Sequence, residues 1–251
     1  RRVMMRTGFL FVALFVITLV GGLIAFAPLS FALRQSGIAD RGVNWQQARG
    51  SVWHGQVTGL SWRGTPLGAV NLDSDVLRFV TGGPSHDVSW SGPFGQGRGR
   101  IKASGSSVVA EEVSLNIPLT EQVGADPVIA QLGSSLRLSN GSVKLSGDRC
   151  EAAAGNVTSD VARLAAASFG RDWPVLSGPL TCTDTRLTAQ LSGDAGDGTR
   201  IVLKAVAQDG FELELTNFDD ELRAALLAAG FTDRNGALVY TRSMNRMETR
   251  P

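Results

Sequence analysis

The chain has 251 residues, a formal net charge of +1 and 30 glycines that follow no strict period. A charge so close to zero, with no basic run, argues against nucleic acid as a partner, because phosphate binding needs clustered Lys and Arg. The length suits one large β-rich domain or two small ones.

The first predicted element is a transmembrane helix over residues 7–33, a run without any charged side chain. A bilayer core takes roughly 20 apolar residues of helix, so this run is long enough to cross it. Arg1, Arg2 and Arg6 precede the run and favour a cytoplasmic tip at residues 1–6. We therefore expect a single-pass membrane protein whose main body lies outside the cytoplasm. The predicted anchor residues are Phe9, Leu10, Phe11, Leu14, Phe15, Ile17, Leu19 and Leu23.

A cleaved signal peptide is the alternative for this segment. Ala25-Phe26-Ala27 has the A-x-A pattern of a cleavage site. However, the apolar run exceeds the usual signal-peptide core of about 7–15 residues. Pro28 follows the site directly and would fit a protease cleft poorly, because its φ is locked and it has no N–H. These observations favour the anchor.

The remainder of the chain predicts a linker over 34–42, a periplasmic-type β-rich domain over 43–242 and a flexible tail over 243–251. Strand-like runs alternate there with Gly-, Asn- and Asp-rich turns, which is typical of an antiparallel meander. The expected fold is mainly β: a curved antiparallel sheet, shaped as a groove or partly rolled, with two or three short capping helices. The helices are expected from Asp126-Pro127 to Gly133, from Ser159-Asp160 to Gly170, and from Asp219 to Gly230.

Three glycine-containing stretches are interpreted as turns. Asn140-Gly141 predicts a hairpin turn between separate strands at 135–138 and 142–146. A last strand is expected after Asn235-Gly236. The run at 95–99 resembles a phosphate loop only superficially, because it lacks the Lys and the following Ser or Thr, so a flexible turn is expected.

The two cysteines, Cys150 and Cys182, are expected to form one disulfide in an oxidising compartment. A metal or redox site is the alternative. No histidine or further cysteine lies near them and there is no C-x-x-C, so the disulfide is favoured.

The stretch GSVWHGQVTGLSWRGTPLG, residues 50–68, concentrates tryptophan and glycine. A turn at 64–68 would make a hairpin in which apolar residues alternate, and Gly59 would mark a bulge. The predicted structural motif, which would also line a groove, consists of Trp53, Val57, Leu60, Trp62, Val70 and Leu72.

The residues that could carry chemistry predict no catalytic or metal site, no cofactor and no enzyme activity. His54 and His86 stand apart, and no nucleophile signature accompanies them. Glu111 and Glu112 are neighbours in a predicted strand, so they should point to opposite faces and cannot form a catalytic pair.

Several patterns together resemble the type II secretion system protein N family, although the stretch after Asp75 departs from it. Stretches 113–119 and 176–182, then Leu187, Leu191 and Gly193, and the ending from Glu221 to Gly236 resemble its later strands and final helix. The motif resembles the family at Gly50, Ser51, Val52, Trp53, Gly55, Val57, Leu60, Trp62, Gly64, Leu67 and Gly68.

This resemblance implies an accessory structural or interaction subunit of the type II secretion system. Such a subunit is anchored in the inner membrane with a periplasmic domain, and it supports export of folded proteins across the outer membrane. The implied partners are other inner-membrane and periplasmic components of the system. The chain is also similar to the wider AsmA-like group, which implies the alternative of a periplasmic lipid-binding or lipid-transfer module.

Overall fold

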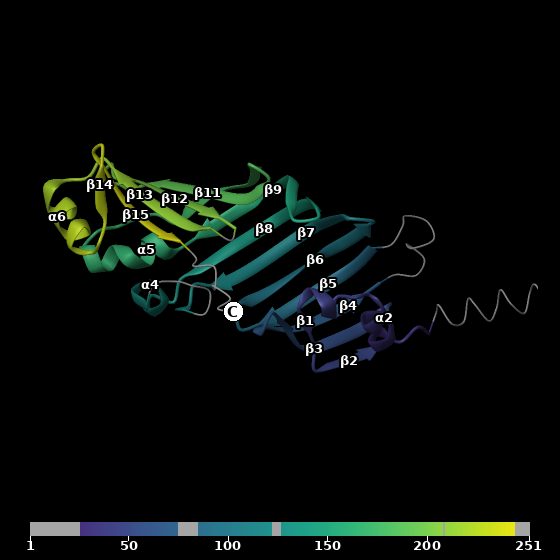
Figure 1. Cartoon of the computed structure of the whole chain (residues 1–251). Coiled ribbons are helices and arrows are strands. Elements are labelled where there is room, and N and C mark those ends of the chain that lie inside the picture. Colours follow the sequence, from purple (N-terminus) through teal and green to yellow (C-terminus); the bar gives the residue numbers. More distant parts are fainter. Residues whose placement is uncertain (1–25, 75–84, 122–126, 208, 244–251) are drawn as a thin grey trace, which may run out of the picture. The chain divides into compact units, whose positions relative to one another are not determined.

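The computed structural model describes residues 26–74, 85–121, 127–207 and 209–243. They fall into two compact units, Arg1–Gly92 (unit 1) and Pro93–Pro251 (unit 2). The predicted β-rich domain at 43–242 extends over both units. All strand pairs within each unit are antiparallel, so the predicted mainly-β class is confirmed (Figure 1).

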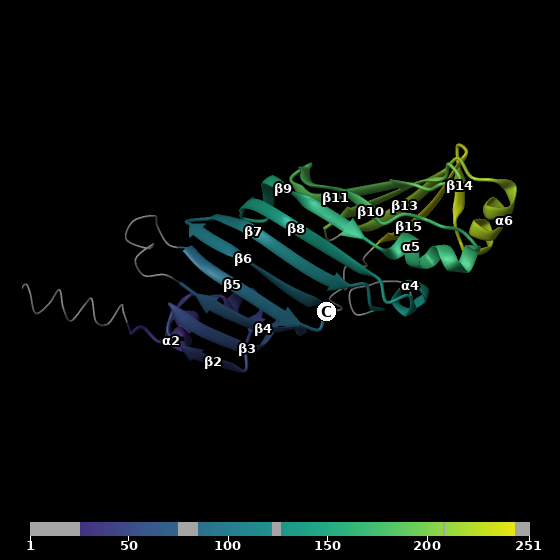
Figure 2. The same cartoon turned by 180° about the vertical axis from the view of Figure 1, so that it is seen from behind.

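Unit 1 is a small sheet with one short helix on its face. Strands β1 and β2 both pair with β3, and β4 and β5 follow in chain order. Helix α2 lies on one face of these strands, in front of them in Figure 1 and behind them in Figure 2. The elements are α2 (Leu29–Gln35), the 3-10 helix η1 (Ala39–Arg41), β1 (Val43–Asn44), β2 (Gln47–Gly50), β3 (His54–Trp62), β4 (Thr65–Asp73) and β5 (Ser85–Gly92).

The predicted membrane anchor lies mostly outside the described residues. Among the described helices, none is long and apolar enough to cross a bilayer. The end of the predicted span, residues 29–33, belongs to α2, and the predicted linker contains the end of α2 and η1. Residues 244–251 of the predicted tail also lie outside the described range, as do Phe9, Leu10, Phe11, Leu14, Phe15, Ile17, Leu19 and Leu23.

Unit 2 is a larger meander in which each strand pairs with its neighbours in the order β6 to β13, then β15, then β14. Among the described strands, β14 pairs only with β15, so the sheet does not close on itself. The elements are β6 (Gly95–Ser104), β7 (Ser107–Pro118), α4 (Pro127–Gln131), β8 (Ser135–Ser146), β9 (Arg149–Ser159), α5 (Val161–Ala165), the 3-10 helix η3 (Ala166–Phe169), β10 (Leu176–Thr183), β11 (Arg186–Asp194), β12 (Arg200–Val206), β13 (Gly210–Thr216), α6 (Asp220–Ala228), β14 (Thr232–Arg234) and β15 (Ala237–Ser243).

The core of unit 2 lies between the C-terminal strands and the helices. The three helices that the sequence predicted are present as α4, as α5 with η3, and as α6. Helices α5 and α6 lie beside β10–β15 in both views. Cross-strand pairing sets Ile201, Leu215 and Leu238 in one row, and all three are at most 1% exposed. Leu222 and Leu226 of α6 are buried in the same cluster, and each such burial stabilises the fold by about 1.5–3 kcal/mol relative to exposure.

Bulges in β7 and β8 and the glycines beside them in β6 and β9 form a line across these strands, and we call it the crease: Gly99, Val113, Gly141 and Gly155. Register shifts occur in β6 next to Gly99, in β7 on both sides of Val113, and in β8 around Gly141. A Cβ on Gly141 would lie 3.1 Å from Val113 Cβ, and one on Gly155 would lie 2.9 Å from Gly141 Cα. The backbones therefore approach closely along this line, and the bulged strands bend there.

The crease keeps the apolar side chains on one face. In β7, Ala110 and Leu115 are five positions apart, an odd spacing that would put them on opposite faces of a regular strand. The bulge corrects this parity, so Ala110 pairs with Val143 and Leu115 pairs with Leu138. The sheet face therefore stays apolar on both sides of the crease.

Three predictions for strands β6–β8 were wrong, because the bulges were not predicted from the sequence. Asn140-Gly141 is a bulge inside the continuous strand β8, with Asn140 at φ +51°, and not a hairpin turn. Residues 95–99 are part of strand β6 and not a flexible turn. Glu111 and Glu112 do not simply point to opposite faces, because Glu112 has φ +53° and the two carboxylates pair with Lys102 and Arg100, which project from one face of β6.

The predicted disulfide between Cys150 and Cys182 is confirmed, with the two Cα atoms 5.6 Å apart. It joins the start of β9 to the end of β10. The ladder between these strands runs only from Leu176–Ser159 to Pro179–Asn156, and Pro179 has no N–H to continue it. The disulfide therefore joins β9 and β10 at the end where their backbone pairing has stopped.

Replacing both cysteines by serine should lower the free energy of unfolding by roughly 3–4 kcal/mol, because the chain-entropy model gives that value for a loop of this length. Thermal unfolding of the full chain, followed by circular dichroism, measures the change. Reductant should lower the wild-type midpoint equally and leave the double variant unchanged. Equal midpoints for oxidised and reduced wild type would contradict the prediction.

Gly141→Ala should destabilise the protein by about 1–3 kcal/mol, the usual cost of overpacking. Its Cβ would lie 2.7 Å from Leu138 Cδ2 and 3.1 Å from Val113 Cβ. The control is Gly196→Ala in the β11–β12 turn, where no atom lies within 4 Å of the new Cβ; its effect should stay within about 0.5 kcal/mol. Denaturant unfolding compares the two variants, and equal midpoints would show that the crease tolerates a side chain.

Candidate functional site

Five of the six predicted groove residues lie on the β3–β4 hairpin, and the sixth, Trp53, directly precedes β3. Val57 pairs with Val70, and Leu72 pairs with Gly55. Leu60 and Trp62 follow a register shift at Gly59, which has φ +64°, so the predicted bulge is confirmed. The six residues differ widely in exposure: Trp53 is 8% and Val57 5% exposed, whereas Trp62 is 46% exposed and has the Arg63 guanidinium 5.2 Å from its ring centroid.

Helix α2 covers part of this hairpin face. A Cβ on Gly55 would lie 2.5 Å from Leu29 Cδ2, and Leu29 is 4% exposed. Gly55 and Val57 are two positions apart in β3 and so lie on the same face. Helix α2 therefore packs on the face that carries the predicted groove residues. The Leu60–Trp62 end of the hairpin is the more exposed part of that face.

Both histidines lie at the other end of this hairpin, with partners that sequence reasoning missed. His54 Nδ1 is 2.7 Å from Asp73 Oδ1, and both side chains are largely exposed. His86 Nδ1 shares a hydrogen bond with the hydroxyl of Ser74, which is 3% exposed. The predicted turn at 64–68 was wrong: β3 and β4 are joined at Arg63-Gly64, so Trp62 pairs with Thr65 and Asp73 lies opposite His54. An exposed ion pair is screened by water and contributes little, so we interpret both contacts as ties between strands.

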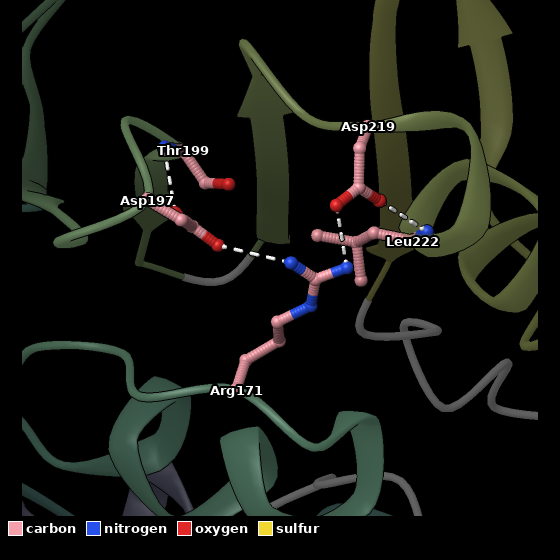
Figure 3. Close-up of polar contacts among 5 residues, drawn as sticks. All are labelled: Arg171, Asp197, Thr199, Asp219 and Leu222. Carbon is pink, nitrogen blue, oxygen red and sulfur yellow. Dashed lines mark hydrogen bonds and ion pairs between the residues drawn. The ribbon is translucent and has the colours of Figure 1, made fainter.

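The densest charged cluster joins three loops at one end of unit 2, and we call it the Arg171 cluster: Arg171, Asp197 and Asp219 (Figure 3). Arg171 follows η3, Asp197 lies between β11 and β12, and Asp219 precedes α6. Arg171 Nη2 is 2.6 Å from Asp219 Oδ2, and Nη1 is 3.5 Å from Asp197 Oδ2. The Arg171 guanidinium thus links the loop after η3 to the β11–β12 loop and to the start of α6.

Each carboxylate of the Arg171 cluster also accepts a backbone hydrogen bond. Asp219 Oδ1 accepts from Leu222 N at 2.8 Å, which caps α6 at its N-terminus. Asp197 Oδ1 accepts from Thr199 N at 2.9 Å. The sequence predicted the helix start at Asp219 but not its pairing with Arg171, because the two residues are 48 positions apart.

These hydrogen bonds change the pKa values of the cluster. The backbone N–H of Leu222, and then the Arg171 guanidinium, lower the pKa of Asp219. The backbone N–H of Thr199 is the main cause that lowers the pKa of Asp197. The bond to Asp219 raises the pKa of Arg171. All three groups are therefore charged at neutral pH, and the cluster can stabilise structure but offers no general acid or base.

No group of three or more His, Cys, Asp or Glu side chains within the described ranges is placed to hold a metal ion. The charged pairs on the sheet are cross-strand contacts, such as Lys144 Nζ to Glu151 Oε2 at 2.7 Å, which lowers the pKa of Glu151.

Comparison with known proteins identifies a family. The model of a family described as type II secretion system (T2SS), protein N, matches residues 41–241. The matched range includes the 50–68 motif, so the predicted resemblance to this family is confirmed. No curated protein and no solved structure matches the chain.

Replacing Asp219 by Asn should make stability less dependent on pH in the acid range. The pKa of Asp219 is lower in the folded than in the unfolded chain, so its contribution is fully present above about pH 4 and is lost as the pH falls through the folded value. Asn removes the charge and keeps an N-cap acceptor. Urea unfolding at neutral and acid pH measures the difference.

Glu221→Gln is the control, because Glu221 is acidic and near the same helix end but affects the pKa of Arg171 less than Asp219 and Asp197 do. The Glu221→Gln variant should lose stability at acid pH much as the wild type does. The prediction fails if Asp219→Asn and wild type lose stability in parallel.

Proposed function

Because the chain belongs to the type II secretion system protein N family, we propose that it is an accessory, non-enzymatic subunit of that secretion system. The match over residues 41–241, which includes most of both units, carries this proposal. The proposed topology has residues 1–6 in the cytoplasm, an inner-membrane anchor within residues 7–33 and the strands of both units in the periplasm. The subunit would support export of folded proteins across the outer membrane by contacting other inner-membrane and periplasmic components.

Two features support the proposed compartment. The Cys150–Cys182 disulfide fits an oxidising space such as the periplasm. The uncharged run at 7–33, preceded by three arginines, fits a single-pass anchor with a cytoplasmic N-terminus.

The strand edges are poor candidates for partner contacts. β14 has only three residues, and two of them, Asp233 and Arg234, form ion pairs with Arg223 and Glu212. In unit 1, Val52 N beyond β2 already donates to Ala27 O at 3.1 Å. Short and charged edges resist the addition of another strand. The proposed contact is therefore a sheet face.

The face that suits a partner is the apolar side of β6 and β7, which we call the β6–β7 apolar face: Val108, Ala110, Leu115, Ile117 and Ile101. These side chains are half-buried or exposed, with Val108 at 38%, and they lie outside the core cluster of unit 2. The opposite face carries the charged pairs Arg100–Glu112 and Lys102–Glu111. Apolar residues that remain accessible on one side of a sheet mark an interaction surface.

A lipid-binding or lipid-transfer role of AsmA-like type is the second candidate, and the same surface favours it. The apolar rows continue from β7 across β8 and β9, as Leu115–Leu138–Val157 and Ala110–Val143–Ala153. Ala110, Val143 and Ala153 are all half-buried, so an acyl chain lying across this row would contact apolar side chains, whereas the other row ends in the core at Val157.

A photo-crosslinking residue at Val108 tests the first candidate in cells that contain the secretion system. The control is the same residue at Gln96, an exposed position on the opposite face of β6. Adducts with secretion-system components at 108 and not at 96 would support the proposal. Lipid adducts at 108, identified by mass spectrometry, would support the second candidate, and no adduct of either kind would overturn both.

Val108→Asp should reduce secretion of a folded substrate several-fold, because a charge on the apolar face must be desolvated when a partner binds. Gln96→Asp adds the same charge on the opposite face and should leave secretion unchanged. Retention of the Cys150–Cys182 disulfide in both variants reports that unit 2 has folded. Equal secretion by the two variants would contradict this use of the face.

A further inference from the structure

Two phenylalanines stand out at the start of the described chain. Phe26 is 83% exposed and Phe31 is 59% exposed, the highest values for large apolar side chains within the described ranges. Exposing a phenylalanine to water is costly, so two neighbouring ones indicate a surface that is covered in the working protein.

The backbone around them is held by unit 1. Val52 N donates to Ala27 O at 3.1 Å, and Pro28 forms an antiparallel bridge with Ser51. Leu29 is buried against Gly55. The exposure of Phe26 and Phe31 is therefore built into the fold.

The periodicity of α2 gives the helix two distinct sides. At 100° per residue, Leu29 and Leu33 fall on one side, and Phe31 and Arg34 on the other. The first side packs on unit 1, and the second faces outward with an aromatic ring beside a cation. Such a pair suits the boundary of a bilayer, where the ring enters the apolar region and the long cationic side chain reaches the phosphates.

The length of the apolar run also places the Phe31 side of α2 at the boundary of the bilayer. The uncharged run begins at Thr7, and a bilayer core takes roughly 20 helical residues, so the proposed span ends near Phe26. Residues 27–29 then connect directly to unit 1, with no free linker between the end of the span and the sheet.

We propose that α2 is an interfacial helix that docks unit 1 on the membrane surface. Phe26 and Phe31 enter the region between head groups and acyl chains, and Arg34 binds lipid phosphates. This proposal rests on the proposed membrane anchor at residues 7–33. It adds that the anchor continues into a rigid connection, so that the face of unit 1 covered by α2 is turned toward the bilayer.

Depth-dependent fluorescence quenching tests the proposal on the full chain. The chain is reconstituted in vesicles of phosphatidylethanolamine and phosphatidylglycerol, with a fluorophore on Phe31→Cys. The native cysteines are bonded to each other and do not react. The matched control is Gln56→Cys, an exposed position next to Gly55 whose side chain points to the face opposite α2.

Lipids that carry a quencher on the acyl chain should quench the fluorophore at position 31 several-fold more than at position 56, and aqueous iodide should do the reverse. Strong iodide quenching at position 31 would overturn the proposal. Protection of position 31 from both quenchers would also overturn it, because a protein partner would then cover the site.

Alkaline carbonate extraction of the same samples separates this proposal from the proposed anchor. A chain that stays in the membrane fraction while position 31 is in water retains the anchor and excludes the interfacial helix. A chain that is extracted excludes the anchor itself. Phe31→Ser should remain in the membrane fraction but lose protection of residues 29–35 from hydrogen exchange.

Discussion

One geometric constraint governs the sheet of unit 2: a bulge adds one residue to its strand, so residues an odd number of positions apart on its two sides can share a face. In β7 and β8 the extra residues lie side by side, where Val113 pairs with Gly141. If one strand lacked its bulge, Leu115 or Leu138 would move to the charged face. In β7 and β8 the apolar residues change between even and odd positions halfway along the strand. The crease allows these residues to form one continuous apolar surface nevertheless.

The same constraint explains which residues occupy the crease. Gly99, Gly141 and Gly155 lie where a side chain would meet the neighbouring strand. Glu112 and Asn140 supply the backbone with positive φ that the bulges need. The positions of the apolar rows thus depend on glycines at the close approaches and on Glu112 and Asn140 at positive φ.

Much of the fold could be predicted from local signals. Asp219 marks the start of α6, and Asn235-Gly236 makes the β14–β15 turn with both residues at positive φ. Asn140-Gly141 is the same kind of residue pair but lies inside a strand. A bulge and a turn both use a positive φ followed by a small residue, so this pair of residues is compatible with either. Only the neighbouring strands distinguish them. The change of parity between Leu138 and Val143 was the available signal for the bulge.

Strand β9 had no signal of its own and was not predicted. Its centre, Ala152–Ala154, has low β-propensity, and the strand is held by β8 and β10 on its two sides. The candidate sites were not predicted either. The His54–Asp73 pair depends on a shorter β3–β4 turn than the predicted one at 64–68. The Arg171 cluster unites three loops that are distant in sequence.

The disulfide has a consequence for the segment that carries Arg171. The loop that it closes, residues 151–181, contains α5, η3 and Arg171, and so delivers the guanidinium that ties the start of α6. Without the disulfide, this segment is held by four backbone pairs between β9 and β10 and by Val161, Ala166 and Trp173, which are buried in the core. The disulfide adds a covalent link at the end of β10, beyond the last of these backbone pairs.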